Sequence, residues 1–302
     1  MTHPRYSIST DWLSGCGGCE VAIVDLDIEG KLAKFLNDYD LVRCPVLMDT
    51  KEYPKANLGI ITGAIRSKHD RESAKAMRES CDKLIAFGTC AAYGGISGAG
   101  YVHSKEEILN AVFQGKENIP KGIPEMEQSP KPADEEVKID LYLPGCPPHP
   151  AYIFDALNNL LKEQPSTSRP MPVCSTCRRI MKKTEVSVLK KYLDGTDDGK
   201  TCLLSQGYLC LGSLTMDRCK APCPQRGIPC IGCGGPTLQI ILEPNRDLRT
   251  ELAERMSRLT NMEKEKIVHE IEASAKTHYA YTMSSQMINR KQTFNIKKWI
   301  QQ

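Results

Sequence analysis

The sequence predicts a mixed α/β chain in three parts: a doubly wound parallel sheet, an irregular metal-binding segment and a C-terminal helical segment. Short apolar runs alternate with helical patterns through residues 1–165, which is typical of a parallel sheet flanked by helices. Residues 173–236 are instead dominated by Cys, Gly and Pro, and residues 237–302 return to a charged helical pattern. We therefore expect domains with these boundaries, with a Pro- and Ser-rich linker at 163–172.

Five candidate strands and four candidate helices make up the first part. The strand candidates are short apolar runs of the kind that parallel sheets bury, at residues 5–9, 41–48, 58–62, 84–88 and 137–143. The helix candidates lie between or after them, at residues 20–39, 71–78, 106–113 and 151–162. Residues 114–136 are rich in Lys, Pro and Glu, so we expect them to form a surface insertion.

Composition excludes some function classes. The chain has 302 residues and a formal net charge of only +3, which gives no indication of nucleic-acid binding. No run of 18 apolar residues occurs, so we expect no insertion into a membrane. The N-terminal residues contain neither an apolar signal region nor a twin-arginine motif, which favours a cytoplasmic location.

Cysteine is the outlier of the composition. The chain contains fourteen, and eight of them lie between Cys174 and Cys233. Such density is typical of disulfide scaffolds, zinc sites or iron–sulfur clusters. Because cytoplasmic thiols stay reduced, the expected location favours metal binding over disulfides.

The first four cysteines follow candidate strands. Cys16 and Cys19 form a C-G-G-C motif after the first strand, Cys90 follows the run at 84–88, and Cys146 follows the last strand. The carboxyl ends of parallel strands meet at one edge of a sheet, where ligands bind. Four thiolates gathered there would form a Cys₄ site, although a lone C-x-x-C is equally typical of zinc sites and redox dithiols.

The next eight cysteines would complete two further four-ligand sites. Their spacing includes two C-x-x-C pairs and a C-x-x-x-C-P piece, and spacing alone does not sort them into sites. Structural zinc remains the alternative for this half of the chain, since Cys₄ zinc sites use the same pairs. The eight are Cys174, Cys177, Cys202, Cys210, Cys219, Cys223, Cys230 and Cys233.

Three motifs together resemble the small subunit of nickel–iron hydrogenases: C-G-G-C-E at 16–20, G-T-C-A-A-Y-G-G at 88–95 and L-P-G-C-P-P at 143–148. The resemblance implies a flavodoxin-like first domain whose four cysteines hold a proximal [4Fe–4S] cluster, nearest the nickel–iron centre of a large-subunit partner. The cluster-bearing subunit of complex I shares this core. It has two adjacent cysteines at the first position and lacks the cysteine-rich second half, and both points favour the hydrogenase.

The same resemblance sorts the second eight cysteines into a distal and a medial [4Fe–4S] cluster. The best-known members use a histidine as one distal ligand and a non-cysteine residue at one medial position, whereas Cys174 and Cys223 stand at these positions here. All-thiolate ligation adds negative charge and is expected to lower the potentials. The implied distal ligands are Cys174, Cys177, Cys202 and Cys210, and the implied medial ligands are Cys219, Cys223, Cys230 and Cys233.

Within this family the chain is most similar to the cytoplasmic methanogen type, the methyl-viologen-reducing hydrogenase. That resemblance implies that electrons from H₂ oxidation pass through three [4Fe–4S] clusters to a small iron–sulfur subunit, which links to heterodisulfide reductase. The deazaflavin-reducing hydrogenase small subunit is the near alternative. A zinc-stabilised binding module and a free-standing ferredoxin-like carrier are alternatives from other classes. No nucleophile–base motif, P-loop or dinucleotide fingerprint occurs, so we expect no substrate chemistry on this chain alone.

Four further residues have open roles. Cys44 and Cys81 have no partner spacing, so we expect buried structural thiols. His149 follows the Cys146 motif and could donate to a cluster sulfur or cap a helix. Glu20 could serve proton movement or act as an ordinary acid at a helix N-terminus.

Overall fold

The computed structural model describes four stretches of the chain, residues 5–115, 119–163, 171–192 and 194–301. The chain divides into two compact units. The first is formed by Met1–Ser168 with Met283–Ser285, and the second by Arg169–Thr282 with Gln286–Gln302. Residues 164–170 of the expected linker lie outside the described residues.

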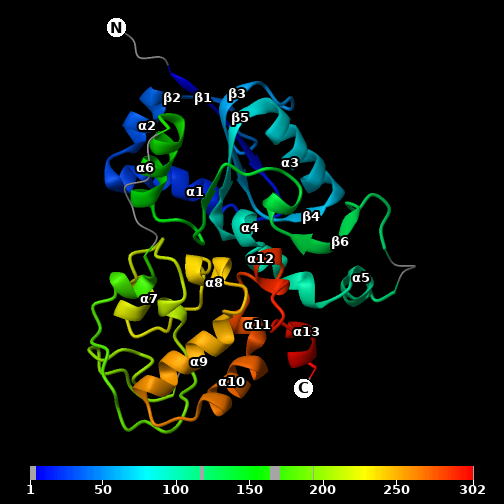
Figure 1. The fold of residues 1–302 in the computed structure, drawn as a ribbon. Coiled ribbons are helices and arrows are strands. Elements are labelled where there is room, and N and C mark those ends of the chain that lie inside the picture. Colours follow the sequence, from blue (N-terminus) through cyan, green and yellow to red (C-terminus); the bar gives the residue numbers. More distant parts are fainter. Residues whose placement is uncertain (1–4, 116–118, 164–170, 193, 302) are drawn as a thin grey trace. The chain divides into compact units, whose positions relative to one another are not determined.

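A five-stranded parallel sheet forms the centre of the first unit (Figure 1). Its strands are β1 (Tyr6–Trp12), β2 (Tyr39–Arg43), β3 (Ala56–Thr62), β5 (Cys81–Phe87) and β7 (Leu141–Leu143). Their order is β2-β1-β3-β5-β7, and each neighbouring pair is parallel. This is the flavodoxin-type order, in which the strand connections change direction between β1 and β3 and leave a ligand crevice at the carboxyl ends. The prediction of a doubly wound parallel sheet is confirmed.

Helices cover both faces of this sheet. On one face lie α1 (Gly18–Val24), α2 (Leu32–Asp38) and α6 (Pro150–Leu161), and α3 (Lys68–Ser80) covers the other (Figure 1). Burial of apolar side chains between helices and sheet is the main force that holds the layers together. The first face packs Leu26, Phe35 and Ile153 on the sheet, and the second packs Ala74 and Met77.

The predicted helix at 20–39 is wrong as a single element. The structure breaks it into α1, a 3-10 turn at Asp25–Glu29, and α2. Gly30 follows that turn with φ 64°, a left-handed conformation that ends helices and favours glycine.

Two predicted strands are shorter than expected. The run at 41–48 stops at Arg43, just before Cys44 and Pro45. The last strand begins only at Leu141, because the carboxylate of Asp140 accepts the Leu84 N–H at 2.8 Å. A side chain there occupies the donor that strand pairing would otherwise use.

Part of the expected surface insertion has regular structure. Within it, β6 (Met126–Lys131) pairs antiparallel with β4 (Ile65–Ser67). Residues 116–118 lie outside the described residues. Two more helices complete the first unit, α4 (Gly88–Tyr93) and α5 (Lys105–Phe113).

The second unit combines irregular loops with short helices. Residues 201–217 are almost entirely buried, although they show no helical or strand periodicity. Leu203, Leu211 and Leu214 contribute its apolar core, together with Leu252 and Met256 of α9. The helices are α7 (Pro222–Gln225), α8 (Leu238–Leu242), α9 (Leu248–Leu259), α10 (Lys264–Ala273), α11 (Ala275–His278), α12 (Gln286–Asn289) and α13 (Ile296–Trp299).

The expectation of a helical C-terminal segment is confirmed by the helices from α8 to α13. Within the described residues, no helix combines the length and the apolar character that crossing a bilayer requires.

Candidate metal-cluster sites

Four strand ends of the first unit converge on one pocket of about 70 Å³. The loop after β1, the end of β3, the start of α4 after β5, and the loop after β7 all line it. The sheet order places these ends side by side at its carboxyl edge. All four cysteines that the sequence places after strands line this pocket: Cys16, Cys19, Cys90 and Cys146.

The four thiols lie close enough to influence one another. Burial raises the pKa of Cys146 to about 11, and negative charge on Cys90 and Cys16 contributes to this rise. Burial also raises the pKa of Cys19, with contributions from Glu20, Cys90, Cys146 and Cys16. Burial and like charges both disfavour bare thiolates. A cationic iron centre is what would make four thiolates stable here, so this donor set fits a cluster.

Two glycines leave room for the thiols. Gly88 has φ 82°, and a Cβ built on it would lie 2.3 Å from Cys19 Sγ. Gly95 has φ 53°, and its Cβ would lie 2.5 Å from Cys90 Sγ. No side chain fits at either position, since both the space and the backbone conformation require glycine.

Two pocket residues, Thr62 and Gly63, lie outside the sequence motifs, and a third, Thr89, lies within the motif at 88–95 but has no role that the motif indicates. Thr62 is the last residue of β3, and Gly63 follows it directly. Of the strands whose ends line the pocket, β3 is the one that no cysteine closely follows in the sequence. The position of Thr62 and Gly63 at a strand end was the available signal, because every such end in this sheet edge faces the same crevice.

Glu20 stands beside Cys19 in the same pocket. Its Oε1 accepts a hydrogen bond from the Thr62 hydroxyl. Its Oε2 is buried and has no hydrogen-bond partner in the described part of the chain. A buried carboxylate oxygen without a partner is costly, which indicates a role toward a group bound at this site.

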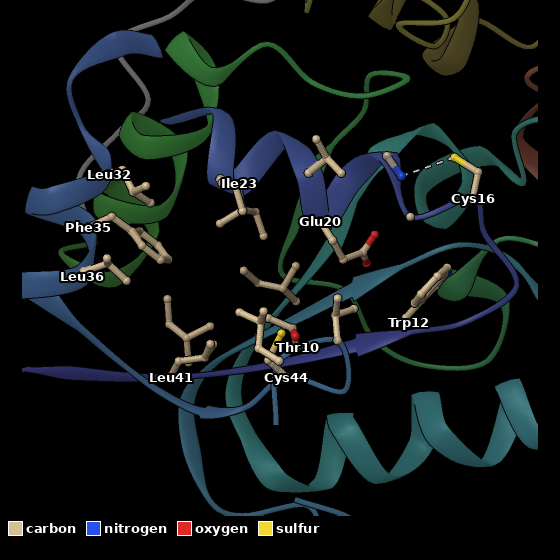
Figure 2. Close-up of a pocket in the computed structure, with 18 residues that line it drawn as sticks. Thr10, Trp12, Cys16, Glu20, Ile23, Leu32, Phe35, Leu36, Leu41 and Cys44 are labelled. Atoms are coloured by element: carbon tan, nitrogen blue, oxygen red, sulfur yellow. Dashed lines mark hydrogen bonds between the residues drawn. The ribbon is translucent and has the colours of Figure 1, made fainter. Parts of the chain in front are cut away.

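An apolar groove of about 490 Å³ opens next to the cysteine pocket and shares Cys16 and Glu20 with it. Figure 2 shows Cys16, Glu20 and Trp12 at one end of the groove, and Leu32, Phe35 and Leu36 at the other. Several apolar side chains that line it are exposed to solvent. They are Trp12, Val21, Val24, Leu36, Val46 and Leu47.

Three further residues that the sequence singled out in the first unit are His149, Cys44 and Cys81, and the structure gives each a position typical of a structural residue. His149 precedes α6, and its Nδ1 accepts the Ala151 N–H at 3.2 Å, so it caps this helix. Cys44 and Cys81 are buried, as expected, and Cys44 also lines the groove. The structure contains no disulfide among the fourteen cysteines, all of which it describes.

In the second unit, four cysteines influence one another as a group. Burial raises the pKa of Cys174 to about 12, and charge on Cys210, Cys202 and Cys177 adds to the effect. Burial raises the pKa of Cys210 to about 11, again with contributions from Cys202 and Cys177. A Cβ on Gly212 would lie 3.5 Å from Cys174 Sγ and 3.6 Å from Cys210 Sγ, so these two sulfurs flank one glycine.

The other four cysteines form two pairs along the chain. Burial raises the pKa of Cys219, and charge on Asp217 and Cys223 contributes. Burial also raises the pKa of Cys230, with a contribution from Cys210 and a smaller one from Cys233. The two groups of the second unit adjoin each other, because the Cys230 N–H donates to Cys210 Sγ at 3.3 Å.

Within the described residues, no three Cys, His, Asp or Glu side chains come together closely enough to hold a single metal ion. Zinc needs its thiolates within about 2.3 Å of one point. A [4Fe–4S] cluster takes each thiolate on a different iron and accepts a wider set.

Comparison with known proteins identifies the family. Residues 16–160 match the family described as the NADH ubiquinone oxidoreductase 20 Kd subunit. An F420-non-reducing hydrogenase vhu subunit of Methanocaldococcus jannaschii is 39% identical over 232 residues, covering 74% of this chain and 80% of the relative. The chain belongs to the family of nickel–iron hydrogenase small subunits. The iron-sulfur subunit of the F420-non-reducing hydrogenase of Archaeoglobus profundus is 32% identical over 316 residues, covering 92% of this chain and 96% of the relative.

Membership in this family confirms the prediction of a nickel–iron hydrogenase small subunit with an electron-transfer role. It also confirms that the chain is a subunit of an oxidoreductase. The solved [NiFeSe]-hydrogenase of Dm. baculatum has the same fold, with a TM-score of 0.50 at 18% identity over 78% of this chain and 96% of that chain. The expected α/β fold with a flavodoxin-like domain is confirmed.

Proposed function

We propose that this hydrogenase small subunit holds three [4Fe–4S] clusters and conducts electrons from H₂ oxidation in a nickel–iron large subunit to an iron–sulfur or flavin partner. The observation that carries the proposal is the convergence of four cysteines from three strand ends on one pocket. Each cluster, when bound, supplies reversible one-electron transfer. The chain's own residues supply the ligands, the exclusion of water and the contacts with partners.

The first pocket would hold the proximal cluster on Cys16, Cys19, Cys90 and Cys146. The glycines at 88 and 95 leave the space that the thiols need, as their close approach to Sγ atoms indicates. The family match at residues 16–160 covers all four ligands.

The grouping of thiols in the second unit supports the distal set Cys174, Cys177, Cys202 and Cys210, since charge within this group contributes to the raised pKa values of Cys174 and Cys210. The medial set Cys219, Cys223, Cys230 and Cys233 rests on the family resemblance, with charge on Cys223 influencing Cys219 and charge on Cys233 influencing Cys230 within it. The contact between Cys230 N–H and Cys210 Sγ supports passage of electrons between the two sets.

The apolar groove supports the proposed large-subunit partner. Exposed apolar patches that adjoin a functional pocket are typical of protein interfaces. Val21 and Val24 on α1 are more than half exposed, and they follow the Cys19 ligand on the same helix. A large subunit seated there would cover the patch and exclude water from the first pocket, which suits entry of electrons at that point.

We propose a small iron–sulfur subunit linked to heterodisulfide reductase as the downstream acceptor, in the cytoplasm. The relatives are named F420-non-reducing hydrogenases, which favours this acceptor over a deazaflavin. An acceptor of this kind would suit all-thiolate clusters, because thiolate ligation lowers potentials.

Metal analysis of the complex purified without oxygen tests the proposal. Three clusters contribute about twelve irons and about twelve sulfides per small subunit, in addition to the iron of the nickel–iron centre and of any iron–sulfur partner in the complex. Replacing one ligand of each set, as Cys146→Ser, Cys210→Ser or Cys233→Ser, is expected to remove about four irons or convert one cluster to a three-iron form. Cys81→Ala changes a buried cysteine outside the three sets and is expected to retain all iron. A colourless protein with zinc in place of iron would overturn the proposal.

A further inference from the structure

One loop of the second unit carries an unusual combination of side chains. We call residues 178–192 the basic loop. It contains six Lys or Arg residues and one Glu. Four large apolar side chains in it are more than half exposed: Ile180 (65%), Met181 (55%), Val188 (65%) and Tyr192 (54%).

The backbone of the basic loop is anchored along its length. The Ile180 N–H donates to the Lys200 carbonyl, and the Cys202 N–H donates to the Ile180 carbonyl, both at 2.8 Å. The Thr184 N–H donates to the Leu259 carbonyl at the end of α9, and the Lys190 N–H to the Gly207 carbonyl, both at 2.9 Å. Fixed backbone with exposed apolar side chains indicates a preformed contact surface, since burial of those side chains is left to a partner.

Much of the positive charge on the loop is not neutralised. Arg179 pairs with Asp197 at 2.6 Å, and it is the one residue of the six that forms an ion pair within the described part of the chain. Hydrogen bonds from Thr201 and Lys200 lower the pKa of Asp198, and the nearby charge of Lys182 contributes. Lys182, Lys183 and Lys191 are exposed.

The nearby acids have other partners or positions. Glu185 accepts a hydrogen bond from Asn261, and Asp194 accepts the Lys191 N–H. Glu270 of α10 lines a hollow beside the loop. The loop therefore carries more positive than negative charge, and Asp194, Asp197, Asp198 and Glu270 reduce it from neighbouring segments.

This hollow has a volume of about 500 Å³ and lies at the end of the loop. Val188, Lys190, Lys191 and Tyr192 line it from the loop side, and Lys266 lines it from α10. Lys190 Nζ lies 5.2 Å from the ring centre of Tyr208, which holds this lysine at the wall. The hollow offers a socket for an apolar or acidic side chain of a partner.

The basic loop also surrounds candidate cluster ligands. It begins directly after Cys177 and touches Cys202 through the backbone of Ile180. At its other end, burial raises the pKa of Tyr192, and charge on Cys223, Cys210 and Cys230 contributes to this rise. A partner docked on this loop would approach both proposed cluster sets of the second unit.

We propose that the basic loop and its hollow are the docking surface for an acidic redox protein that accepts electrons from this subunit. The proposal rests on the proposed electron-transfer function and specifies the chemistry of the acceptor. Lysines would steer an acidic partner, and the exposed apolar side chains would supply the contact area. Oxidation of H₂ yields two electrons and two protons in the large subunit, and each one-electron acceptor centre takes up one electron.

Steady-state reduction of a protein acceptor by H₂ tests this surface in the intact complex. The probe is a strongly acidic bacterial two-cluster ferredoxin, and a basic c-type cytochrome serves as the probe of opposite charge. The variant is the triple charge reversal Lys182→Glu, Lys183→Glu and Lys191→Glu. The control carries the same charge change at three exposed lysines elsewhere: Lys51→Glu, Lys121→Glu and Lys138→Glu. Reduction of methyl viologen, which needs no docking, reports the integrity of the clusters.

For the ferredoxin, we expect the loop variant to raise KM about tenfold or more at low salt, and we expect the control to change it by less than about twofold. The difference should shrink at high salt, because screening weakens steering. Dye reduction should stay unchanged in both variants. The milder triple change to Gln should raise KM by a smaller factor in the same direction.

Three results would overturn the proposal. One is equal KM values for the loop variant and the control while dye reduction is intact. Another is a lower KM for the cationic cytochrome than for the ferredoxin, measured with the unmodified complex. The third is salt-sensitive binding of the unmodified complex to phosphatidylserine vesicles, with no effect of the loop on ferredoxin reduction. Loss of iron or dye reduction in the unmodified complex would instead remove the underlying electron-transfer function.

Discussion

Thr89 and Gly145 exchange two hydrogen bonds: the Thr89 N–H donates to the Gly145 carbonyl at 2.8 Å, and the Gly145 N–H donates to Thr89 Oγ1 at 2.9 Å. Each residue directly precedes a proposed ligand, Cys90 or Cys146. The pair ties the loop after β7 to the start of α4, so it fixes the separation of two thiols from different strands.

Replacing Thr89 with Val is expected to destabilise this corner. The change leaves the buried Gly145 N–H without its acceptor, which costs about 1–2 kcal/mol. It should also lower the iron bound at the first pocket, because Cys146 is no longer held in register with Cys90. Thr89→Ser keeps the hydroxyl and serves as the control. Chemical denaturation and iron analysis of both variants measure the effects, and equal values for Val and Ser would contradict this role.

Gly88→Ala is expected to expel the first cluster. Its new Cβ would lie 2.3 Å from Cys19 Sγ, at a backbone conformation that costs about 1 kcal/mol for any L residue. Gly122→Ala is a matched control, since Gly122 has φ 91° and no atom within 4 Å of the added Cβ. Iron analysis should show a loss of about four irons in the first variant and none in the second. Full iron content in the Gly88→Ala variant would show that Cys19 does not bind a cluster with its Sγ at the position that the added Cβ blocks.

The position of the first site could be predicted from sequence because each cysteine follows a strand-like run, and the ends of parallel strands converge. Thr62 and Thr89 could not be singled out in the same way. Thr62 contributes a side chain that lines the pocket, and Thr89 contributes a hydrogen bond to the loop after β7. Both contributions depend on tertiary contacts. The break at Gly30 depends on one left-handed residue inside an otherwise helical pattern. For the basic loop, the lysines are visible in sequence, whereas the anchoring of the backbone and the exposure of Ile180 are not.

Charge placed on the groove should weaken binding of the large subunit. Val21→Asp puts a carboxylate on a surface that the proposed interface would bury, and an unpaired buried charge costs more than the roughly 1.4 kcal/mol that corresponds to tenfold in affinity. Co-purification of nickel with the tagged small subunit should fall at least about tenfold. Val112→Asp makes the same change at an exposed valine of α5 outside the groove. If both variants retained nickel equally, the groove would not be the large-subunit surface.

His278 should make stability depend on pH between about 6.5 and 4. Burial lowers its pKa from the ordinary value of 6.5 to about 4, so the folded chain binds fewer protons than the unfolded chain in this window. Stability is therefore complete above about pH 6.5 and falls with decreasing pH until the folded pKa is reached. Between pH 7 and pH 5 the loss should be on the order of 1 kcal/mol, or a few degrees in Tm. His278→Asn should flatten the dependence of Tm on pH in anaerobic thermal scans, and His269→Asn, at an exposed position on α10, should not. Parallel pH profiles for the His278→Asn variant and the unmodified chain would show that burial of this imidazole does not contribute.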